Sequence, residues 1–333
     1  MRKLRIGIGK GYDVLIERGL LPHCGKYVRS VSRGTRAMVV CGETVSGLYS
    51  GTVRQSLENA GFLTERFVYP GGEKHKNADT YIALLNAMAD FHMCRSDCVV
   101  ALGGGVTGDI AGFAAASYMR GVSFVQIPTT LLSMVDSSVG GKCGIDLSAG
   151  KNLVGAFYQP LTVLCDPDVL STLSPDDLCD GYAEVAKYSM LCKPNLLSVP
   201  DCETEEIVYE SLDAKRSYIE GDERDEGMRM YLNLGHTIAH ALEKQSDFTL
   251  SHGKALSIGL AVMSRYADDV CTYLRSHGLP TELNVDTQEL CKLMMNDKKR
   301  RGDDVSLVLY KGLGSCELKT VKYSELHSIL FGN

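Results

Sequence analysis

The chain has 333 residues, of which 44% are hydrophobic and 23% charged, and its formal net charge is −6. This composition is typical of a soluble globular protein with two domains and argues against a disordered chain. The negative charge gives no reason to expect nucleic acid or an anionic membrane as partner, and no apolar run reaches the roughly 18–20 residues that cross a bilayer. The basic start Met1–Lys3 has no apolar signal-peptide core after it, and the twelve cysteines form no CxxC pair. We therefore expect reduced thiols and a cytoplasmic protein.

The first half of the chain predicts strands that alternate with helices. A strand pair is expected at Leu4–Ile8 and Asp13–Ile16, around the turn residues Gly9–Gly11. Further strands are expected at Ala37–Cys41, Thr64–Tyr69, Asp97–Leu102 and Val122–Ile127, and helices at Val45–Ala60 and Ala78–Met93. Strands separated by helices indicate βαβ crossovers and a largely parallel sheet.

Beyond about residue 170 the pattern becomes helical. Helical spacing covers Leu178–Leu191, Glu205–Glu220, Tyr231–Lys244 and Lys254–Arg275, with few strand signals between them. The predicted fold is therefore α/β. It consists of a Rossmann-like, parallel-sheet domain over residues 1–168, followed by a mainly α-helical domain over residues 169–333.

A glycine run, Gly103–Asp109 (GGGVTGD), follows a buried-strand pattern and precedes a helix of small residues. Glycines let backbone N–H groups approach an anion closely, and a helix N-terminus adds a favourable dipole. The run is neither a GxGxxG fingerprint nor a Walker motif. The run predicts either of two features equally well: a binding site for a phosphate or pyrophosphate, or a tight turn without a ligand.

Two lysines stand among glycines further along the chain. Asp136 and Lys142 belong to the segment VDSSVGGK, and Lys151 and Asn152 follow Gly150. Lysines are point-charge partners for phosphate and carboxylate groups. A single loop lysine is more often simply solvated, but this density of glycine and polar residues indicates a binding loop for an anion.

Histidines gather in the helical half. His236 and His240 are spaced i,i+4 and share one face of a helix, His252 follows soon after, and Glu184 stands among apolar helix positions. One carboxylate with imidazoles, and one position left for water or substrate, is the composition of a catalytic zinc site. The spacing is not HExxH, so no metalloprotease is indicated. A lone helix histidine is more often structural, but three close together favour a site.

In order and spacing, these motifs resemble those of the 3-dehydroquinate synthase family, within the sugar phosphate cyclases. The matching segments are Gly103–Asp109, Arg120–Gly121, Gln126–Leu132, Val135–Lys142, Gly150–Asn152, Ala183–Lys187 and Asn233–Glu243. The resemblance covers nearly the whole chain. It implies that residues 1–168 bind NAD and that residues 169–333 bind a divalent metal and the substrate. The implied reaction converts 3-deoxy-D-arabino-heptulosonate 7-phosphate to 3-dehydroquinate and phosphate, in the shikimate pathway of aromatic amino acid biosynthesis.

The resemblance also implies roles for individual residues. Glu184, His236 and His252 match the ligands of Zn²⁺ or Co²⁺, and His240 matches an active-site histidine beside them. Residues implied around the substrate are Asp136, Lys142, Lys151, Asn152, Lys187, Lys215, Arg229, Asn233 and a lysine of the Lys298–Lys299 pair. Those implied around NAD are Glu73, Lys76, Gly104, Val106, Asp109, Thr129 and Thr130, together with Asp136, Lys142 and Lys151. Arg120 matches an arginine that reaches the substrate phosphate across a dimer interface, which implies a homodimer.

The implied chemistry fits these residue types. A substrate hydroxyl is oxidised by NAD, phosphate is eliminated, the hydride returns and the ring closes, so NAD is regenerated in each turnover. Lys142, Lys187, Lys215 and Arg229 suit a substrate that carries both a carboxylate and a phosphate. Arg229 can bind the carboxylate through two parallel hydrogen bonds, which a lysine cannot do.

Four positions depart from the family pattern, namely Gly42, Asp146, Asp176 and Asp225. Gly42 stands where an aspartate near the adenine ribose is usual, which leaves the affinity for NAD open. The alternatives are a cyclase of another sugar phosphate, such as a deoxyinosose or sedoheptulose 7-phosphate cyclase, a dehydrogenase of the glycerol dehydrogenase type, and a non-catalytic binding protein. Arg229 and Asn233 favour a carboxylated substrate, and the lysine-containing loop favours phosphate chemistry. We therefore expect a synthase.

Overall fold

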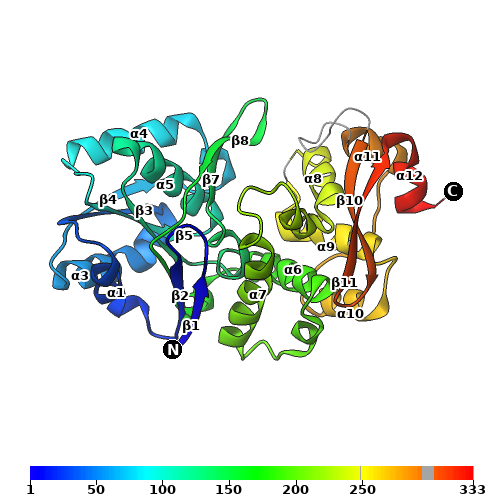
Figure 1. The fold of residues 1–333 in the computed structure, drawn as a ribbon, viewed down its shortest axis with the longest axis horizontal. Coiled ribbons are helices and arrows are strands. Elements are labelled where there is room, and N and C mark those ends of the chain that lie inside the picture. The colour runs from blue at the N-terminus through cyan, green and yellow to red at the C-terminus, as the bar shows by residue number, and fades with distance from the viewer. Residues whose placement is uncertain (248, 295–303, 333) are drawn as a thin grey trace. The chain divides into compact units, whose positions relative to one another are not determined.

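The computed structural model describes residues 1–247, 249–294 and 304–332, and Figure 1 shows their helices and strands. The chain divides into two compact units, unit 1 over Met1–Leu173 and unit 2 over Ser174–Asn333. The division comes shortly after residue 168, where the sequence places the boundary. No helix in these described ranges combines the length and the hydropathy needed to cross a membrane.

Unit 1 is built on a seven-stranded sheet with the order β1-β2-β9-β6-β5-β3-β4. The strands are β1 (Arg2–Ile6), β2 (Tyr12–Ile16), β3 (Arg36–Gly42), β4 (Leu63–Tyr69), β5 (Cys98–Gly103), β6 (Ser123–Pro128) and β9 (Thr162–Cys165). Only the β1–β2 pair is antiparallel within this sheet. Strand β5 is buried along its whole length, which explains its continuous apolar sequence. The predicted parallel sheet is confirmed.

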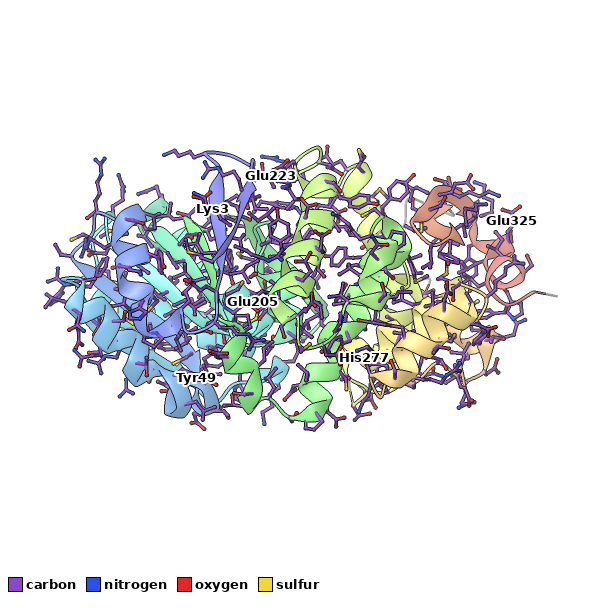
Figure 2. The ribbon with its side chains drawn as sticks, turned by 90° about the horizontal axis from the view of Figure 1, so that it is seen from below. Lys3, Tyr49, Glu205, Glu223, His277 and Glu325 are labelled. Atoms are coloured by element: carbon purple, nitrogen blue, oxygen red, sulfur yellow. The ribbon has the colours of Figure 1, made fainter. Side chains whose placement is uncertain are left out.

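Helices flank this sheet, and one of them is interrupted. The helices of unit 1 are α1 (Cys24–Val31), α2 (Glu43–Val45), α3 (Gly51–Asn59), α4 (Ala78–Asp90) and α5 (Gly105–Ser117), with short helical turns at η1 (Leu21–His23), η3 (Glu73–His75), η4 (Tyr118–Arg120) and η6 (Pro167–Thr172). The helix predicted over Val45–Ala60 is divided by a π-helical turn, η2 (Ser46–Ser50). Tyr49 in this turn, labelled in Figure 2, donates a hydrogen bond to the Val169 carbonyl at 3.1 Å and contacts Thr172 Oγ1 at 2.7 Å. These bonds tie the turn to η6.

A two-stranded hairpin, drawn in green in Figure 1, occupies the segment that the sequence predicts as a binding loop. It pairs β7 (Lys142–Leu147) with β8 (Gly150–Phe157) in antiparallel register. Cys143 and Ile145 of β7 are buried in the same apolar core as Ala111 and Ala114 of α5. The loop prediction was therefore incomplete, because packing against a helix distant in sequence holds this glycine-rich segment as strands.

Unit 2 is mainly helical, and it also contains a hairpin. Its elements are α6 (Pro175–Leu191), η7 (Pro194–Ser198), α7 (Thr204–Ile219), η8 (Met228–Asn233), α8 (His236–Gln245), α9 (His252–Met263), α10 (Asp268–Ser276), α11 (Thr287–Met294), β10 (Asp304–Gly312), β11 (Ser315–Lys322) and α12 (Tyr323–Phe331). The antiparallel β10–β11 pair was not predicted. The segment Lys254–Arg275, predicted as one helix, forms two, because Arg265 and Tyr266 adopt left-handed backbone angles with φ of 52° and 58°.

Helix α6 runs through the interior of unit 2. Every residue from Gly181 to Leu191 is buried, including two with charged side chains, Glu184 and Lys187. Its neighbours include α9, α7 and η8. Burying charge is costly unless the charges are paired. The two buried charges therefore indicate a functional site around α6.

Candidate functional site

Three potential metal ligands converge in unit 2 from three different helices. Glu184 comes from the middle of α6, and His236 and His252 are the first residues of α8 and α9. Their ligand atoms all lie within 4.8 Å of one another. Glu184 Oε1 lies 3.1 Å from His252 Nε2 and 3.5 Å from His236 Nε2. Both imidazoles thus direct the same nitrogen toward one carboxylate oxygen.

The start of α8 is shaped by two glycines. Gly235 caps the helix in the left-handed region, with φ of 78°, a conformation that most other residues avoid. Gly259 of α9 lies against this cap, and a Cβ on Gly259 would lie 2.3 Å from the Gly235 carbonyl oxygen. Without side chains at this contact, α8 and α9 approach closely enough to place His236 and His252 side by side, with ring centroids 5.4 Å apart.

The tautomer of His236 is set by its backbone. Its Nδ1 lies 3.1 Å from the Leu234 carbonyl oxygen. A carbonyl can only accept, so Nδ1 carries the proton and donates it. The lone pair of a neutral imidazole is then on Nε2, the atom that faces Glu184, which is the arrangement that metal-binding histidines adopt.

A buried ion pair adjoins the three ligands. Lys187, one turn after Glu184 on α6, places its Nζ 2.5 Å from Glu184 Oε2, and the two side chains are only 2% and 1% exposed. Among the described residues none gives Glu184 Oε2 a well-aligned hydrogen bond, so we describe the Lys187 contact as an ion pair. The carboxylate therefore keeps acceptor capacity for a further cation.

The protonation of these groups follows from their neighbours. Burial acts to raise the pKa of Glu184, but Lys187 and the neighbouring imidazoles of His236 and His252 outweigh it, so the pKa lies well below its ordinary value. Burial lowers the pKa of His236 to about 4, against the influence of Glu184. Burial also acts to lower the pKa of His252, but Glu184 and Glu243 raise it to about 10. Glu184 is thus an anion and His236 a neutral imidazole.

This donor set fits a divalent cation. An ionised carboxylate and two imidazoles meet at one point, and a divalent cation bound there would displace the proton from His252 Nε2. Oxygen and nitrogen donors of this kind suit zinc and its neighbours among the divalent metals. His240 is exposed, one turn after His236, and the two ring centroids are 5.6 Å apart.

Two further cations of the predicted substrate site are buried in unit 2. Lys215 on α7 is 5% exposed, and Arg229 in η8 is 3% exposed. Arg229 donates from Nη1 to the Glu223 carbonyl at 2.6 Å, and its backbone N–H donates to Asp222 at 3.0 Å. Asn233, at the end of η8, donates to the Met230 carbonyl at 2.9 Å. Lys298 and Lys299 lie outside the described residues.

Four of the predicted NAD residues, Gly104, Val106, Thr129 and Thr130, follow the carboxyl ends of β5 and β6 in unit 1. Gly104 caps α5 directly after β5, and Val106 lies in the first turn of the helix. Thr129 and Thr130 follow β6, and the Thr129 N–H donates to the Gly103 carbonyl at 3.0 Å. Asp136 lies a few residues further on, in a π-helical turn over Ser133–Ser137. The crevice beyond the carboxyl ends of parallel strands is where such sheets bind ligands.

A second ion-pair cluster in unit 1 centres on Lys76, which is buried. Its Nζ lies 2.5 Å from Asp109 Oδ2 and donates to Asn152 Oδ1 at 2.5 Å. Asp146 completes the cluster, because its N–H donates to the Lys76 carbonyl at 2.7 Å and its Oδ1 accepts from the Asn152 N–H at 2.6 Å. Lys151 is nearby, 3.6 Å from Glu73 Oε1. The β7–β8 hairpin thus joins three predicted site residues, Lys76, Asp109 and Asn152, to Asp146.

Asp109→Asn should change how stability depends on pH. Burial raises the pKa of Asp109 from 3.8 to about 6, more than Lys76 lowers it. The folded state therefore holds this proton more tightly than the unfolded chain, and ionisation costs stability as pH rises from about 4 to about 6. The variant has no such group to ionise. The difference in free energy of unfolding, variant minus wild type, should therefore rise by up to about 3 kcal/mol as the pH increases from 4 to 7. Urea unfolding at both pH values measures this.

The expected change is smaller than that limit, because the Asp109 side chain is 22% exposed. Asp90→Asn, at an exposed carboxylate at the end of α4, is the matched control. If the difference between Asp109→Asn and wild type were the same at both pH values, the raised pKa would be wrong.

Two further predicted residues are exposed. Arg120 is exposed in η4, directly after α5, and Lys142 begins β7. Conversely, three acidic residues had no predicted role. Asp146 contacts Asn152, Glu243 contacts His252, and Asp180 bonds to Ser251 and Gly253 on either side of His252. For Asp180 a signal exists, since it precedes Glu184 by one helical turn and so shares its face of α6.

Comparison with known proteins places the chain in a family. Residues 66–180 match the family model of the 3-dehydroquinate synthase N-terminal domain, and residues 181–300 match that of the C-terminal domain. The chain is 39% identical to a 3-dehydroquinate synthase of Lactococcus lactis subsp. cremoris and 39% identical to one of Streptococcus suis, each alignment covering 96% of both proteins.

Solved structures share the fold. A 2-deoxy-scyllo-inosose synthase complexed with carbaglucose-6-phosphate, NAD⁺ and Co²⁺ matches with a TM-score of 0.86 at 21% identity, over 99% of each chain. A 2-epi-5-epi-valiolone synthase from Streptomyces hygroscopicus matches with a TM-score of 0.85 at 24% identity, over 96% of this chain and 95% of its own. An iron-containing alcohol dehydrogenase is less similar, with a TM-score of 0.62 at 18% identity, over 86% and 91%. By its whole-length sequence similarity, the chain belongs to the 3-dehydroquinate synthase family.

Proposed function

We propose that this chain converts 3-deoxy-D-arabino-heptulosonate 7-phosphate to 3-dehydroquinate and phosphate. The observation that carries the proposal is the convergence of Glu184, His236 and His252 beside the buried Lys187. This group lies in a chain that aligns along 96% of its length with relatives named for that reaction. The reaction belongs to the biosynthesis of aromatic amino acids through shikimate.

The proposed cofactors are NAD and a divalent cation, Zn²⁺ or Co²⁺. When bound, the cation supplies Lewis acidity and NAD⁺ accepts and returns a hydride, so the cofactor is not consumed. Glu184, His236 and His252 would hold the cation. The glycine turn at Gly104 and the threonines Thr129 and Thr130 would hold NAD, because backbone N–H groups at a helix start favour its pyrophosphate.

The buried cations of unit 2 are proposed to bind the anionic groups of the substrate. Arg229 is fixed by its bond to the Glu223 carbonyl, and a fixed guanidinium recognises a carboxylate through two parallel bonds. Lys187 and Lys215 present ammonium groups with little exposure to water, where charge attraction is strong. His240 is proposed to assist proton movement as phosphate leaves. A substrate with a carboxylate as well as a phosphate uses all of these groups.

The test is a phosphate-release assay with the purified, metal-loaded protein. It uses 3-deoxy-D-arabino-heptulosonate 7-phosphate with NAD⁺ in amounts far below the substrate, and absorbance is followed for NADH. We expect phosphate and 3-dehydroquinate in equal amounts without lasting NADH, since the hydride returns to the product. Steady accumulation of NADH would instead indicate a dehydrogenase. Phosphate release only from sedoheptulose 7-phosphate or glucose 6-phosphate would indicate a related cyclase.

We further propose that the protein acts as a homodimer in which Arg120 serves the site of the partner subunit. Met119 and Arg120 adopt left-handed angles with φ of 49° and 65°, a strained geometry that often marks functional positions. The apolar side chains of Leu153, Val154 and Phe157 on β8 are 36–43% exposed. A second copy of the chain would cover them. The twelve cysteines are all thiols, which supports a place in the cytoplasm.

Arg120→Ala should weaken substrate binding and be rescued by mixing subunits. If Arg120 acts across the dimer, a mixed dimer of Arg120→Ala and His252→Ala subunits retains one complete site. Equal mixing should then restore about a quarter of the wild-type activity, since about half of the dimers are mixed and half of their sites are complete. Refolding the two variants together tests this, with phosphate release measured at a substrate concentration too low for Arg120→Ala alone to release appreciable phosphate. No recovery would place Arg120 in its own subunit's site, and unchanged kinetics of Arg120→Ala would remove it from the site.

A further inference from the structure

The position of His252 is held from α6 by a residue that is not itself a ligand. Asp180 Oδ1 accepts hydrogen bonds from Ser251 Oγ at 2.6 Å and from the Gly253 N–H at 3.1 Å. These two residues flank His252 on either side. Ser251 is also the N-cap of α9, where its side chain accepts from the Lys254 N–H. One carboxylate thus holds the Ser251 side chain before the ligand and the Gly253 backbone after it.

The approach of α9 to α6 at this point leaves no room for a side chain. A Cβ on Gly253 would lie 2.3 Å from Asp180 Cα and 2.6 Å from its Oδ1, closer than real Cβ contacts. Asp180 and Glu184 are separated by one helical turn, so they share one face of α6. Asp180 therefore holds the backbone at His252, while Glu184 meets the Nε2 atom of its ring.

The other ring nitrogen of His252 meets a second carboxylate. Glu243 of α8 has a side chain only 8% exposed, and its Oε1 lies 3.5 Å from His252 Nδ1. The imidazole is thus placed between Glu184 at Nε2 and Glu243 at Nδ1. In a neutral imidazole with its proton on Nδ1, the lone pair is on Nε2, which is the atom at the proposed cation site.

We propose that Asp180 and Glu243 are positioning residues that prepare His252 to bind the divalent cation. Asp180 fixes the position of His252, and Glu243 determines which ring nitrogen of His252 offers its lone pair to the cation. Outer residues of this kind typically change metal affinity 10- to 100-fold. The inference rests on the proposed function only in taking Glu184, His236 and His252 as cation ligands.

The test measures Co²⁺ affinity directly, without turnover. The metal-free protein competes with a chromophoric chelator for Co²⁺, and the visible spectrum of the bound ion reports its coordination. Asp180→Ala should weaken Co²⁺ binding 10- to 100-fold. Asp180→Asn keeps an acceptor oxygen and should remain close to the wild type. Glu243→Ala should weaken binding similarly and alter the visible spectrum, and Glu243→Gln should weaken it less.

The chain offers a matched control between the same two helices. Asp176 of α6 pairs with Lys254 of α9 at 3.0 Å, but the Asp176 side chain is 80% exposed. Asp176→Ala should leave the affinity for Co²⁺ unchanged, although it also removes a link between α6 and α9. If Asp180→Ala folds poorly, Ser251→Ala removes the same hydrogen bond from the other partner and should weaken Co²⁺ binding several-fold.

The outcomes separate this inference from the proposed function. Wild-type affinity and spectrum in Asp180→Ala and Glu243→Ala, with Co²⁺ bound normally by the wild type, would overturn the positioning roles alone. A wild type that fails to bind Co²⁺ would overturn the ligand assignment together with the inference. Weakened binding in the variants would support the inference even if the phosphate-release assay failed.

Discussion

His252→Ala is expected to lose the divalent cation and the phosphate-releasing activity together. The substitution leaves Glu184 and His236 as the remaining ligands of the proposed site. Because changes in outer residues already cost 10- to 100-fold in metal affinity, loss of a ligand should cost more than about 100-fold. Elemental analysis of the purified variant after dialysis, with the phosphate-release assay on the same sample, measures both effects.

A histidine elsewhere in unit 2 provides the control for this experiment. His327 contacts Thr287 at 3.0 Å and the ring of Phe331 rather than the ligand group. His327→Ala should keep both metal and activity. Full metal occupancy in His252→Ala would refute its assignment as a ligand, whatever the activity.

Lys187→Met is expected to destabilise the metal-free protein by about 3–5 kcal/mol, the usual cost of removing one partner of a buried ion pair. Lys187 and Glu184 are 2% and 1% exposed, so water cannot replace the lost ammonium. A bound cation supplies positive charge beside the same carboxylate. Co²⁺ should therefore reduce the destabilisation, and urea unfolding with and without the metal measures the difference. Activity should be lost even with Co²⁺ bound, since Lys187 is a proposed substrate contact.

Lys193→Met gives the matched comparison at the surface. Lys193 pairs with Glu210 and Asp213 at 2.7 Å each, but its side chain is 28% exposed. Ion pairs in contact with water contribute about 0–1 kcal/mol, so the variant should unfold within about 1 kcal/mol of the wild type. Equal effects of the two substitutions would mean that the Lys187–Glu184 pair is not isolated from solvent.

Several features of the fold could be predicted because they are encoded locally. The buried run of β5 and the glycines that follow it indicate a strand, a tight turn and a helix start from sequence alone. The hairpins were missed for the opposite reason. In β7 and β8 the glycine-rich sequence carries little alternation, and packing of Cys143 and Ile145 against α5 stabilises the strands. The break in the predicted helix Lys254–Arg275 contains neither glycine nor proline.

The candidate site likewise has features that could be predicted from the sequence and features that could not. The spacing of His236 and His240, the nearby His252 and the carboxylate Glu184 at an apolar helix position are visible in the sequence, and the family resemblance implies which of them are ligands. That Glu184 and His252, 68 residues apart, meet within 3.1 Å is decided by the packing of α6 against α9. Asp146, Asp180 and Glu243 gain their roles only through such contacts.

By itself, then, the sequence determined the α/β class, the helical second half and the chemical types of the site residues. Each of these depends on local periodicity or on the residue's own functional group. The tertiary structure alone decided which imidazole nitrogen faces Glu184 and which carboxylates hold the ligands. It also decided that Lys187 is buried as an ion pair. The burial of Lys187 and the meeting of Glu184 with His236, His252 and their neighbouring carboxylates arise from contacts between helices distant in the chain, and no local pattern specifies such contacts.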